Sequence, residues 1–271
     1  HGTAPGIDLE VQTSGRTTRI FALPGVPAEM KTMWEATVAP ALAATLPEAA
    51  TILQRRIKCF GAGESGIEAM LPDLVDRGRD PLVGITAHEA TITLRIAARG
   101  RDAEECGRKI AGTEAVIRVC LGRLVFGVEA EELEDATLAA LAEQNQTLAI
   151  CELGTDGRTT TLAAQAGSRR LQAGLPPVFA GGSVVVSGDP VDPAALAERA
   201  RRDYSATVGL GIGPVRPAAD GRPAIGFAVV SESGIQIAEH VLGGGPDLAG
   251  SRAAKSALDM VRIQTLDQAD A

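Results

Sequence analysis

The sequence predicts an α/β protein in three parts: an α/β segment, a small α+β domain and a larger α/β sandwich. Strand and helix patterns alternate along most of the chain, which favours sheets covered by helices. A length of 271 residues is sufficient for two or three hydrophobic cores. With 45% hydrophobic and 22% charged residues, the composition is typical of globular proteins.

Charge and hydropathy exclude several classes of function. No apolar run approaches the roughly 20 residues of a membrane-spanning helix, and no basic-then-apolar leader opens the chain, so we expect a cytoplasmic protein without a membrane partner. The net charge of −8 repels phosphate backbones, which makes nucleic acid an unfavoured partner. Because the chain begins at His1 in a turn-like GTAPG stretch, it is interpreted as a fragment or a processed product.

The residues that usually hold metals are sparse. The chain has three histidines and four cysteines, and no two cysteines form a CxxC pair. This spacing predicts buried, reduced thiols and neither a zinc nor a redox site. Carboxylates, hydroxyls and backbone amides must therefore carry any chemistry. The cysteines are Cys59, Cys106, Cys120 and Cys151.

The first predicted part covers residues 1–48. An apolar strand at 19–23, a Pro-Gly-Val-Pro turn at 24–27 and a helix at 28–44 follow one another. Such a turn can present amide groups to an anion at the helix N-terminus, although a simple connection is the favoured interpretation of the turn alone. Glu29 could bind a metal-bound ligand or cap the helix.

The second predicted part covers residues 51–126 and has the order strand, helix, strand, strand, helix. That order favours an α+β domain with its helices on one face of the sheet. The expected ranges are 52–60, 65–76, 82–86, 90–97 and 103–120.

A GxxG sequence at 63–66 matches the loop with which KH domains clamp nucleotides. Glu64 would put a carboxylate where phosphate should lie, so we prefer the interpretation that Ser65 or Glu64 caps the following helix. Glu64 and Glu68 lie one helical turn apart. This pair of carboxylates could hold a divalent cation, but such a pair is more typical of a solvated helix face.

The third predicted part covers residues 130–271, where helices and strands alternate and predict a mixed sheet. No internal repeat links its segments. Helices are expected from Leu133 onward and at 159–165, 193–203 and 248–263, and strands at 147–151, 178–187, 208–212, 224–230 and 234–241.

Three groups of motifs follow one another along the chain. The first is GTAPG at 2–6 with LPGVPAEMK at 23–31, the second is FGAGES at 60–65 with Glu68 and the strand at 92–97, and the third comprises the glycines at 181–182, the stretches 209–214 and 222–226 and the final helix at 252–254. In order and spacing these groups resemble the CinA family: the first is similar to the end of its molybdopterin-binding-like domain, the second to its KH-like middle domain and the third to its C-terminal domain.

The resemblance implies two activities. The complete N-terminal domain is associated with Mg- or Co-dependent cleavage of ADP-ribose, but its opening half is absent here. The C-terminal domain is associated with deamidation of nicotinamide mononucleotide. The residues that the resemblance assigns to binding this nucleotide class are Gly2, Thr3, Ala4, Pro5, Gly6, Pro24, Gly25, Pro27, Glu29, Gly157, Gly211 and Gly213. Gly211 and Gly213 also have a structural explanation as tight turns between strand and helix, which we favour.

The serine nucleophile of the family is missing. In the family it lies in Ala-Glu-Ser-Cys-Thr-Gly-Gly, at a strand-to-helix turn. Residues 151–157 read CELGTDG, so that Glu152, Thr155 and Gly157 match while Leu153 stands at the serine. A leucine side chain has no lone pair with which to attack a carboxamide.

Neighbouring residues indicate further losses at this degenerate site. Cys151 is expected to point into the core, and Thr155 to lie on the phosphate-facing side of the turn. Val186 and Val191 stand where the family has a tyrosine and a lysine, and the stretch 243–246 offers no substrate arginine. Asp156 puts a negative charge where a phosphate would lie.

Three functions remain open. The intact protein could be a nucleotide pyrophosphatase whose C-terminal domain is a passive dimerisation or regulatory module. Thr155 or Cys151 could support residual amidase activity. The chain could also be a non-enzymatic nucleotide-binding or assembly module, most plausibly a homodimer.

Overall fold

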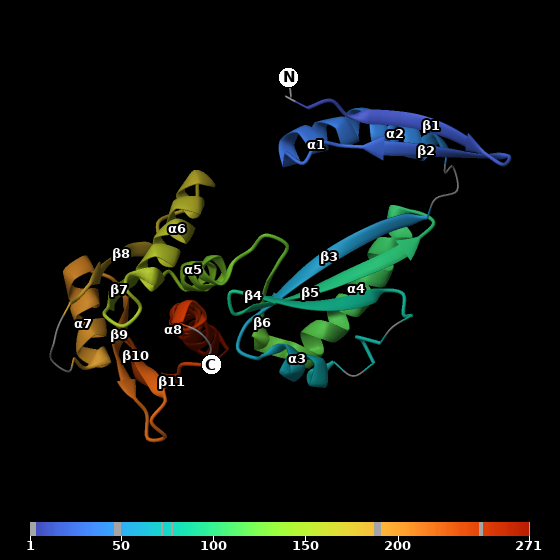
Figure 1. Cartoon of the computed structure of the whole chain (residues 1–271). Helices are drawn as coiled ribbons and strands as arrows, with labels where there is room; N and C mark the ends of the chain where they lie inside the picture. Colours follow the sequence, from blue (N-terminus) through green and yellow to red (C-terminus); the bar gives the residue numbers. More distant parts are fainter. Residues whose placement is uncertain are drawn as a thin grey trace. The chain divides into compact units, whose positions relative to one another are not determined.

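The computed structural model describes residues 4–45, 50–71, 73–76, 78–186, 191–243 and 246–270, without the side chains of Thr45 and of 246–248 (Figure 1). The chain divides into two compact units. One consists of His1–Thr51 with Gly100–Asp102, and the other of Ile52–Arg99 with Ala103–Ala271. Within the described residues, none of the helices combines the length and hydropathy that crossing a lipid bilayer requires.

The first unit is a β-hairpin followed by a helical segment. Strands β1 (Ile7–Thr13) and β2 (Arg16–Ala22) pair in antiparallel register around a turn at residues 14–15. The second of these strands was predicted at 19–23, and no prediction was made for residues 7–13, where β1 lies. The predicted helix is confirmed but interrupted by one π-helical turn; it comprises α1 (Pro27–Met33), η1 (Trp34–Val38) and α2 (Ala39–Thr45).

The second unit contains a four-stranded sheet of order β4-β5-β3-β6. The predicted strands and helices are present, and a short additional strand, β6, closes the edge beside β3. The sheet shares an apolar core with both helices, including the fully buried Ile57, Leu94 and Ile117. The elements are β3 (Thr51–Cys59), α3 (Glu64–Met70), β4 (Leu82–His88), β5 (Thr91–Gly100), α4 (Ala103–Leu121) and β6 (Val125–Val128).

Helix α3 differs from its prediction at both ends. It stops at Met70, six residues early, and Leu71 leaves the helical region with φ −118° and ψ 61°. Its N-cap is Gly63, which has no side chain and makes no capping hydrogen bond. The expected cap by Ser65 or Glu64 is therefore wrong, because both residues lie inside the helix.

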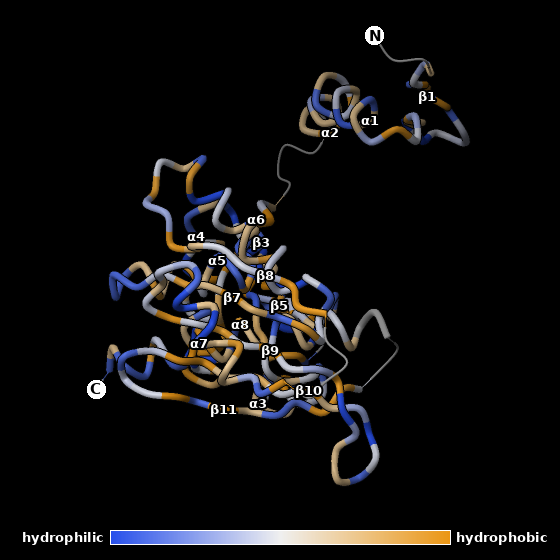
Figure 2. Tube along the Cα trace, turned by 90° about the vertical axis from the view of Figure 1, so that its left-hand side faces the viewer, coloured by the Kyte–Doolittle hydropathy of each residue, from blue (hydrophilic) through white to orange (hydrophobic). Residues whose placement is uncertain are grey.

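A second sheet has the order β11-β10-β9-β7-β8. Strand β7 is parallel to both of its neighbours, whereas β9, β10 and β11 form an antiparallel meander, so the predicted mixed sheet is confirmed. Strand β7 and most of β9 and β10 are buried, whereas β11 is largely exposed and alternates in hydropathy as expected of an edge strand (Figure 2). The strands are β7 (Leu148–Glu152), β8 (Phe179–Val184), β9 (Val208–Pro217), β10 (Pro223–Ser231) and β11 (Gly234–Val241).

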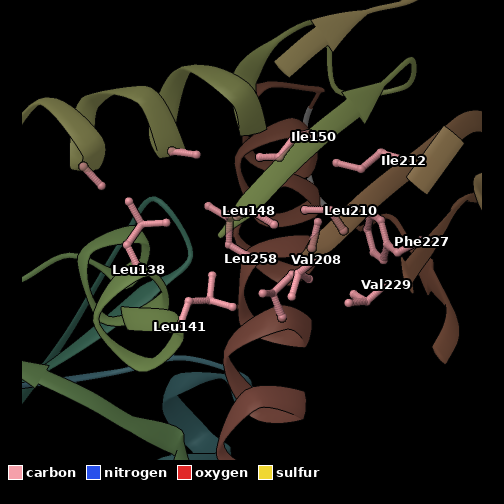
Figure 3. Packing of buried hydrophobic residues seen from close by; sticks show 14 of the residues in the cluster. Leu138, Leu141, Leu148, Ile150, Val208, Leu210, Ile212, Phe227, Val229 and Leu258 are labelled. Carbon is pink, nitrogen blue, oxygen red and sulfur yellow. The ribbon is translucent and has the colours of Figure 1, made fainter. Parts of the chain in front are cut away.

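Helices cover both faces of this second sheet. On one face, α5 (Leu133–Glu143), α6 (Arg158–Gln172) and α8 (Pro246–Ala269) enclose the largest core, in which Ile150, Phe227 and Leu258 meet (Figure 3). On the other face, α7 (Pro193–Tyr204) packs on alanine and cysteine side chains of β7. The predicted α/β sandwich is confirmed.

Glycines in β9 allow α7 to lie unusually close to the sheet. A Cβ added at Gly211 would lie 1.9 Å from the Pro193 carbonyl oxygen, and one at Gly209 would lie 2.0 Å from that of Ala197. Backbone atoms on a packed helix cannot move aside, so only glycine fits. Gly211 and Gly213 were expected in tight turns, which is wrong: both lie within strand β9.

Candidate functional site

The turn at residues 153–157 links β7 to α6 at the carboxyl end of a parallel strand, a position where α/β proteins often bind ligands. Its first two residues continue the pairing with β9. The Leu153 amide donates to the Ile212 carbonyl at 3.0 Å, and the Gly154 amide to the Gly213 carbonyl at 3.1 Å. The sheet therefore fixes the entry to the turn.

Glu152 is the polar centre of this turn. Its side chain is fully buried. The carboxylate accepts hydrogen bonds from the backbone amides of Thr160 at 2.7 Å and Thr159 at 3.2 Å, and from the Thr155 hydroxyl. Because the N-cap residue Gly157 has no side chain, Glu152 supplies the acceptor that the first turn of α6 requires. A negative charge is also favourable at this end of the helix dipole.

Thr155 faces inward. Only 1% of the residue is exposed, its hydroxyl donates to Glu152, and its oxygen accepts from the Thr159 hydroxyl at 3.2 Å. The expectation that Thr155 lies on the phosphate-facing side of the turn is therefore wrong. The buried Glu152 carboxylate attracts the hydroxyl toward the protein interior.

Cys151 points into the core, as predicted. It is fully buried in the cluster formed with Leu196 and Ala200 of α7, and its sulfur accepts a hydrogen bond from the Ser183 hydroxyl at 3.4 Å. Leu153 is half-buried. Within 151–158, all of which the structure describes, both potential nucleophiles are thus inside the protein.

Backbone geometry accounts for the glycines of the turn. A Cβ at Gly154 would lie 2.5 Å from the Gly213 carbonyl oxygen, so the close approach to β9 requires glycine there. Gly157 has φ 81°, in the left-handed region that glycine adopts without strain. Asp156, also left-handed with φ 54°, is exposed. These residues explain the shape of the turn without a ligand.

The two valines at the positions of the family's tyrosine and lysine contribute no catalytic group to the turn. Val186 is 96% exposed, and Val191 packs against the cluster beneath α7. A cation that the sequence analysis missed is Arg158, whose guanidinium lies so close to α8 that a Cβ at Gly250 would meet its Nη1 at 2.1 Å. Its position directly after the turn glycine was the available signal.

The first unit brings only part of the other predicted set together. Gly6 lines a cavity of about 200 Å³ with Phe21 and Met33. Ala4 and Pro5, which precede it in the chain, are exposed. The described residues that line this cavity include none of the turn residues Pro24, Gly25, Pro27 or Glu29. Gly2 and Thr3 lie outside the described residues.

The PGVP turn leads directly into α1. Pro27 occupies the first position of the helix, where its missing amide is not needed, and Val26 is the N-cap without a side-chain hydrogen bond. Throughout the described residues, no group of three or more His, Cys, Asp and Glu side chains is close enough to hold a metal ion.

The prediction for the cysteines is correct for three of the four. Cys59, Cys106 and Cys151 are buried and free, and burial raises the pKa of the Cys59 thiol to about 12. Cys120 is exposed near the end of α4, so the expectation of a buried thiol is wrong there.

Together, the fold and the site define a class: an α+β domain with a GxxG loop, followed by an α/β sandwich in which a buried glutamate caps the helix that follows a parallel strand. Residues 54–127 match the family described as the damage-inducible protein CinA KH domain. This match and the relatives below confirm the resemblance to the CinA family, and the chain is CinA-like.

Curated relatives extend the similarity beyond the KH domain. The chain is 35% identical over 159 residues to a CinA-like protein of Frankia casuarinae, covering 58% of this chain and 36% of the relative. It is 32% identical over 189 residues to a putative competence-damage inducible protein of Bacillus mycoides, covering 70% of this chain and 43% of the relative. The matches thus span less than half the length of these relatives.

Solved structures are similar at lower identity. A CinA superfamily protein from Escherichia coli shares 17% identity with a TM-score of 0.41, covering 54% of this chain and 97% of the other. One from Klebsiella pneumoniae shares 14% identity with a TM-score of 0.41, covering 51% and 99%.

Proposed function

We propose that this CinA-like chain keeps the framework of a nicotinamide-nucleotide amidase without its chemistry, and serves pyridine-nucleotide or ADP-ribose metabolism as a nucleotide-binding or assembly module. One observation carries the proposal: the turn at 153–157 presents no nucleophile on its outer side, because Leu153 replaces the serine and Thr155 is buried.

Deamidation requires an oxygen or sulfur atom that can reach the carboxamide carbon. The Cys151 sulfur is enclosed by the packing of α7, and the Thr155 oxygen already accepts the Thr159 hydroxyl. Both would need the turn to open before a substrate could approach them. Val186, where the resemblance expects a tyrosine, is a second loss that supports an inactive site.

One contact favours the competing candidate, a residual amidohydrolase. The Thr155 hydroxyl donates to the Glu152 carboxylate, which is the arrangement of a nucleophile and its base. Full burial of this pair argues against access by substrate. The two candidates differ in one measurable quantity, the release of ammonia from nicotinamide mononucleotide.

The experiment measures ammonia release by the wild-type chain, Leu153→Ser and Thr155→Val, with a serine-containing CinA relative as the positive control. We expect background release from all three forms of this chain. Background release from Leu153→Ser is expected because the residue at 186 still lacks a hydroxyl. Release by the wild type that Thr155→Val abolishes would contradict the proposal and establish the amidohydrolase.

Retained binding is tested separately. Nicotinamide mononucleotide and ADP-ribose should each be titrated against the chain while its melting temperature is followed, because a ligand that binds only the folded state raises it. A rise of the melting temperature without turnover supports a binding role. No rise with either nucleotide leaves assembly as the role, and background ammonia release is still expected.

Homodimerisation belongs to the assembly role. Ile235 and Ile237 lie on the edge strand β11 and are 63% and 65% exposed, an apolar edge of a kind that a second chain can cover. Sedimentation equilibrium should give twice the chain mass, and Ile235→Lys with Ile237→Lys should shift it to the monomer. A wild-type monomer at high concentration contradicts this part of the proposal.

The pyrophosphatase activity is proposed for proteins that carry the complete N-terminal domain, with which the resemblance associates the Mg or Co ion. Among the described residues of this chain, no group of three or more His, Cys, Asp and Glu side chains is close enough to hold such an ion. ADP-ribose hydrolysis should be measured with either metal for this chain and for a full-length relative carrying the same C-terminal part. Hydrolysis by this chain alone would contradict the expectation.

A further inference from the structure

A pocket of about 590 Å³ lies within the second unit, apart from the turn at 153–157, none of whose residues lines it. Its walls come from four segments: the GxxG loop after β3, the tight turn between β4 and β5, the end of β11, and one face of α8. The volume is sufficient for a small organic molecule.

Arg252 is the charged group that distinguishes this pocket. The residue is half-buried on α8, and its guanidinium makes no hydrogen bond or ion pair with any other residue that the structure describes. Five N–H donors of a partly desolvated arginine normally find acceptors in the protein. Because the N–H donors of Arg252 have no acceptor in the pocket, an anion that enters it could accept hydrogen bonds from them.

His240 shares the wall with Arg252. Burial and then the charge of Arg252 lower the pKa of the imidazole, which favours its neutral form. A neutral imidazole offers one donor and one acceptor rather than a second positive charge. The carboxylates of Glu64 and Glu89 are exposed at the pocket's rim and would repel a multiply charged ligand.

The apolar part of the lining is preformed. Phe60 and Ile92 are 5% and 3% exposed, so their positions are fixed by the core on one side while they face the pocket on the other. The buried Lys255 ammonium donates to the Thr91 hydroxyl at 2.8 Å, which ties α8 to the first residue of β5. Two walls of the pocket are thereby held together.

Backbone strain marks the same place. The two-residue turn between β4 and β5 consists of Glu89 with φ 44° and Ala90 with φ 64°, both in the left-handed region. Hairpin turns of this type normally use glycine, which lacks a Cβ, or asparagine and aspartate, whose short polar side chains tolerate the left-handed region. Such strain concentrates where a particular backbone shape serves binding.

We propose that this pocket binds a small organic monoanion, whose anionic group pairs with Arg252 and whose apolar body lies against Phe60, Ile92 and Val241. The anionic group is a carboxylate or a singly charged phosphate ester. This inference does not rest on the proposed function, because it concerns a different face of α8 from the one that meets Arg158 at Gly250.

The test titrates benzoate and phenyl phosphate separately into the chain, with binding followed by calorimetry and by amide shifts of Gly61 and Gly63 in NMR spectra. We expect at least one probe to bind one-to-one with a dissociation constant of about 1 mM. Binding of benzoate alone assigns a carboxylate ligand, and binding of phenyl phosphate alone a phosphate ester. Failure of both to shift these amides overturns the proposal.

Variants test the role of Arg252. Arg252→Ala should raise the dissociation constant of the bound probe by roughly tenfold or more, because a charge-assisted hydrogen bond is lost. Arg252→Lys, which keeps the charge without the planar fork, should give a smaller loss. Arg202→Ala, an exposed arginine on α7, is the matched control and should change binding less than twofold. Equal affinity of the wild type and both Arg252 variants overturns the proposal.

Discussion

Replacing Glu152 by glutamine is expected to destabilise the α/β sandwich although the side chain keeps its size. The carboxylate is fully buried and accepts from two backbone amides and one hydroxyl. A glutamine has only one acceptor oxygen, and its amide nitrogen would face a donor. One buried N–H group is therefore left without a partner.

The magnitude follows from these contacts. An unsatisfied buried donor costs about 1–3 kcal/mol, and the lost charge at the N-terminus of α6 costs about 0.3–1 kcal/mol. We expect the free energy of unfolding to fall by about 2–3 kcal/mol for Glu152→Gln. For a domain of this size that lowers the melting temperature by roughly 4–12 °C.

The assay combines urea unfolding followed by circular dichroism with hydrogen exchange of the Thr159 and Thr160 amides. Both amides should exchange faster in Glu152→Gln because each donates to this carboxylate. Glu232→Gln, an exposed position between β10 and β11, is the matched control and should stay within about 0.5 kcal/mol of the wild type. If Glu152→Gln is as stable as this control, the capping role assigned to Glu152 is refuted.

Three further outcomes are expected. Gly211→Ala should prevent α7 from packing on the sheet and lower the free energy of unfolding by several kcal/mol. Gly112→Ala, whose added Cβ has no atom within 4 Å inside α4, should instead stabilise the chain by about 0.5–1 kcal/mol. Equal unfolding midpoints of the two variants would contradict this. The pKa of His240 is lowered from 6.5 in the folded chain, so below that pH the unfolded chain binds more protons than the folded chain does. The free energy of unfolding should therefore fall as the pH falls through about 6.5. A flat pH profile, the same as that of the His240→Gln variant, would contradict the burial of the ring. In the native chain iodoacetamide should modify Cys120 alone, because the other thiols are buried, and mass spectrometry showing equal modification of Cys59 would refute the packing described.

Local sequence patterns predicted most elements. The alternation of β5 and the polar face of α4 are periodic over enough residues to predict both with bounds close to those observed. The errors have local causes. Pro72 disfavours a helical conformation at Leu71, so α3 ends before the apolar pattern does. Strand β6 has only four residues, one of them glycine, too few for a period to be recognised.

The alternation of Ile7, Leu9 and Val11 with polar residues was also sufficient to predict β1. Both strands of the hairpin are largely exposed, which the alternating pattern alone does not reveal.

The sequence by itself determined that a leucine stands at residue 153, where the resemblance places the serine nucleophile, because the identity of a residue needs no coordinates. It also determined the alternating order of strands and helices, since that order follows from local periodicity. Only the tertiary structure decided which way Thr155 points and why Gly211 must be glycine. Those facts depend on what the rest of the chain brings close: a buried carboxylate beneath the turn in one case, and the backbone of α7 in the other. Contacts between residues distant in the sequence leave no periodic signal, and they set the chemistry of the site.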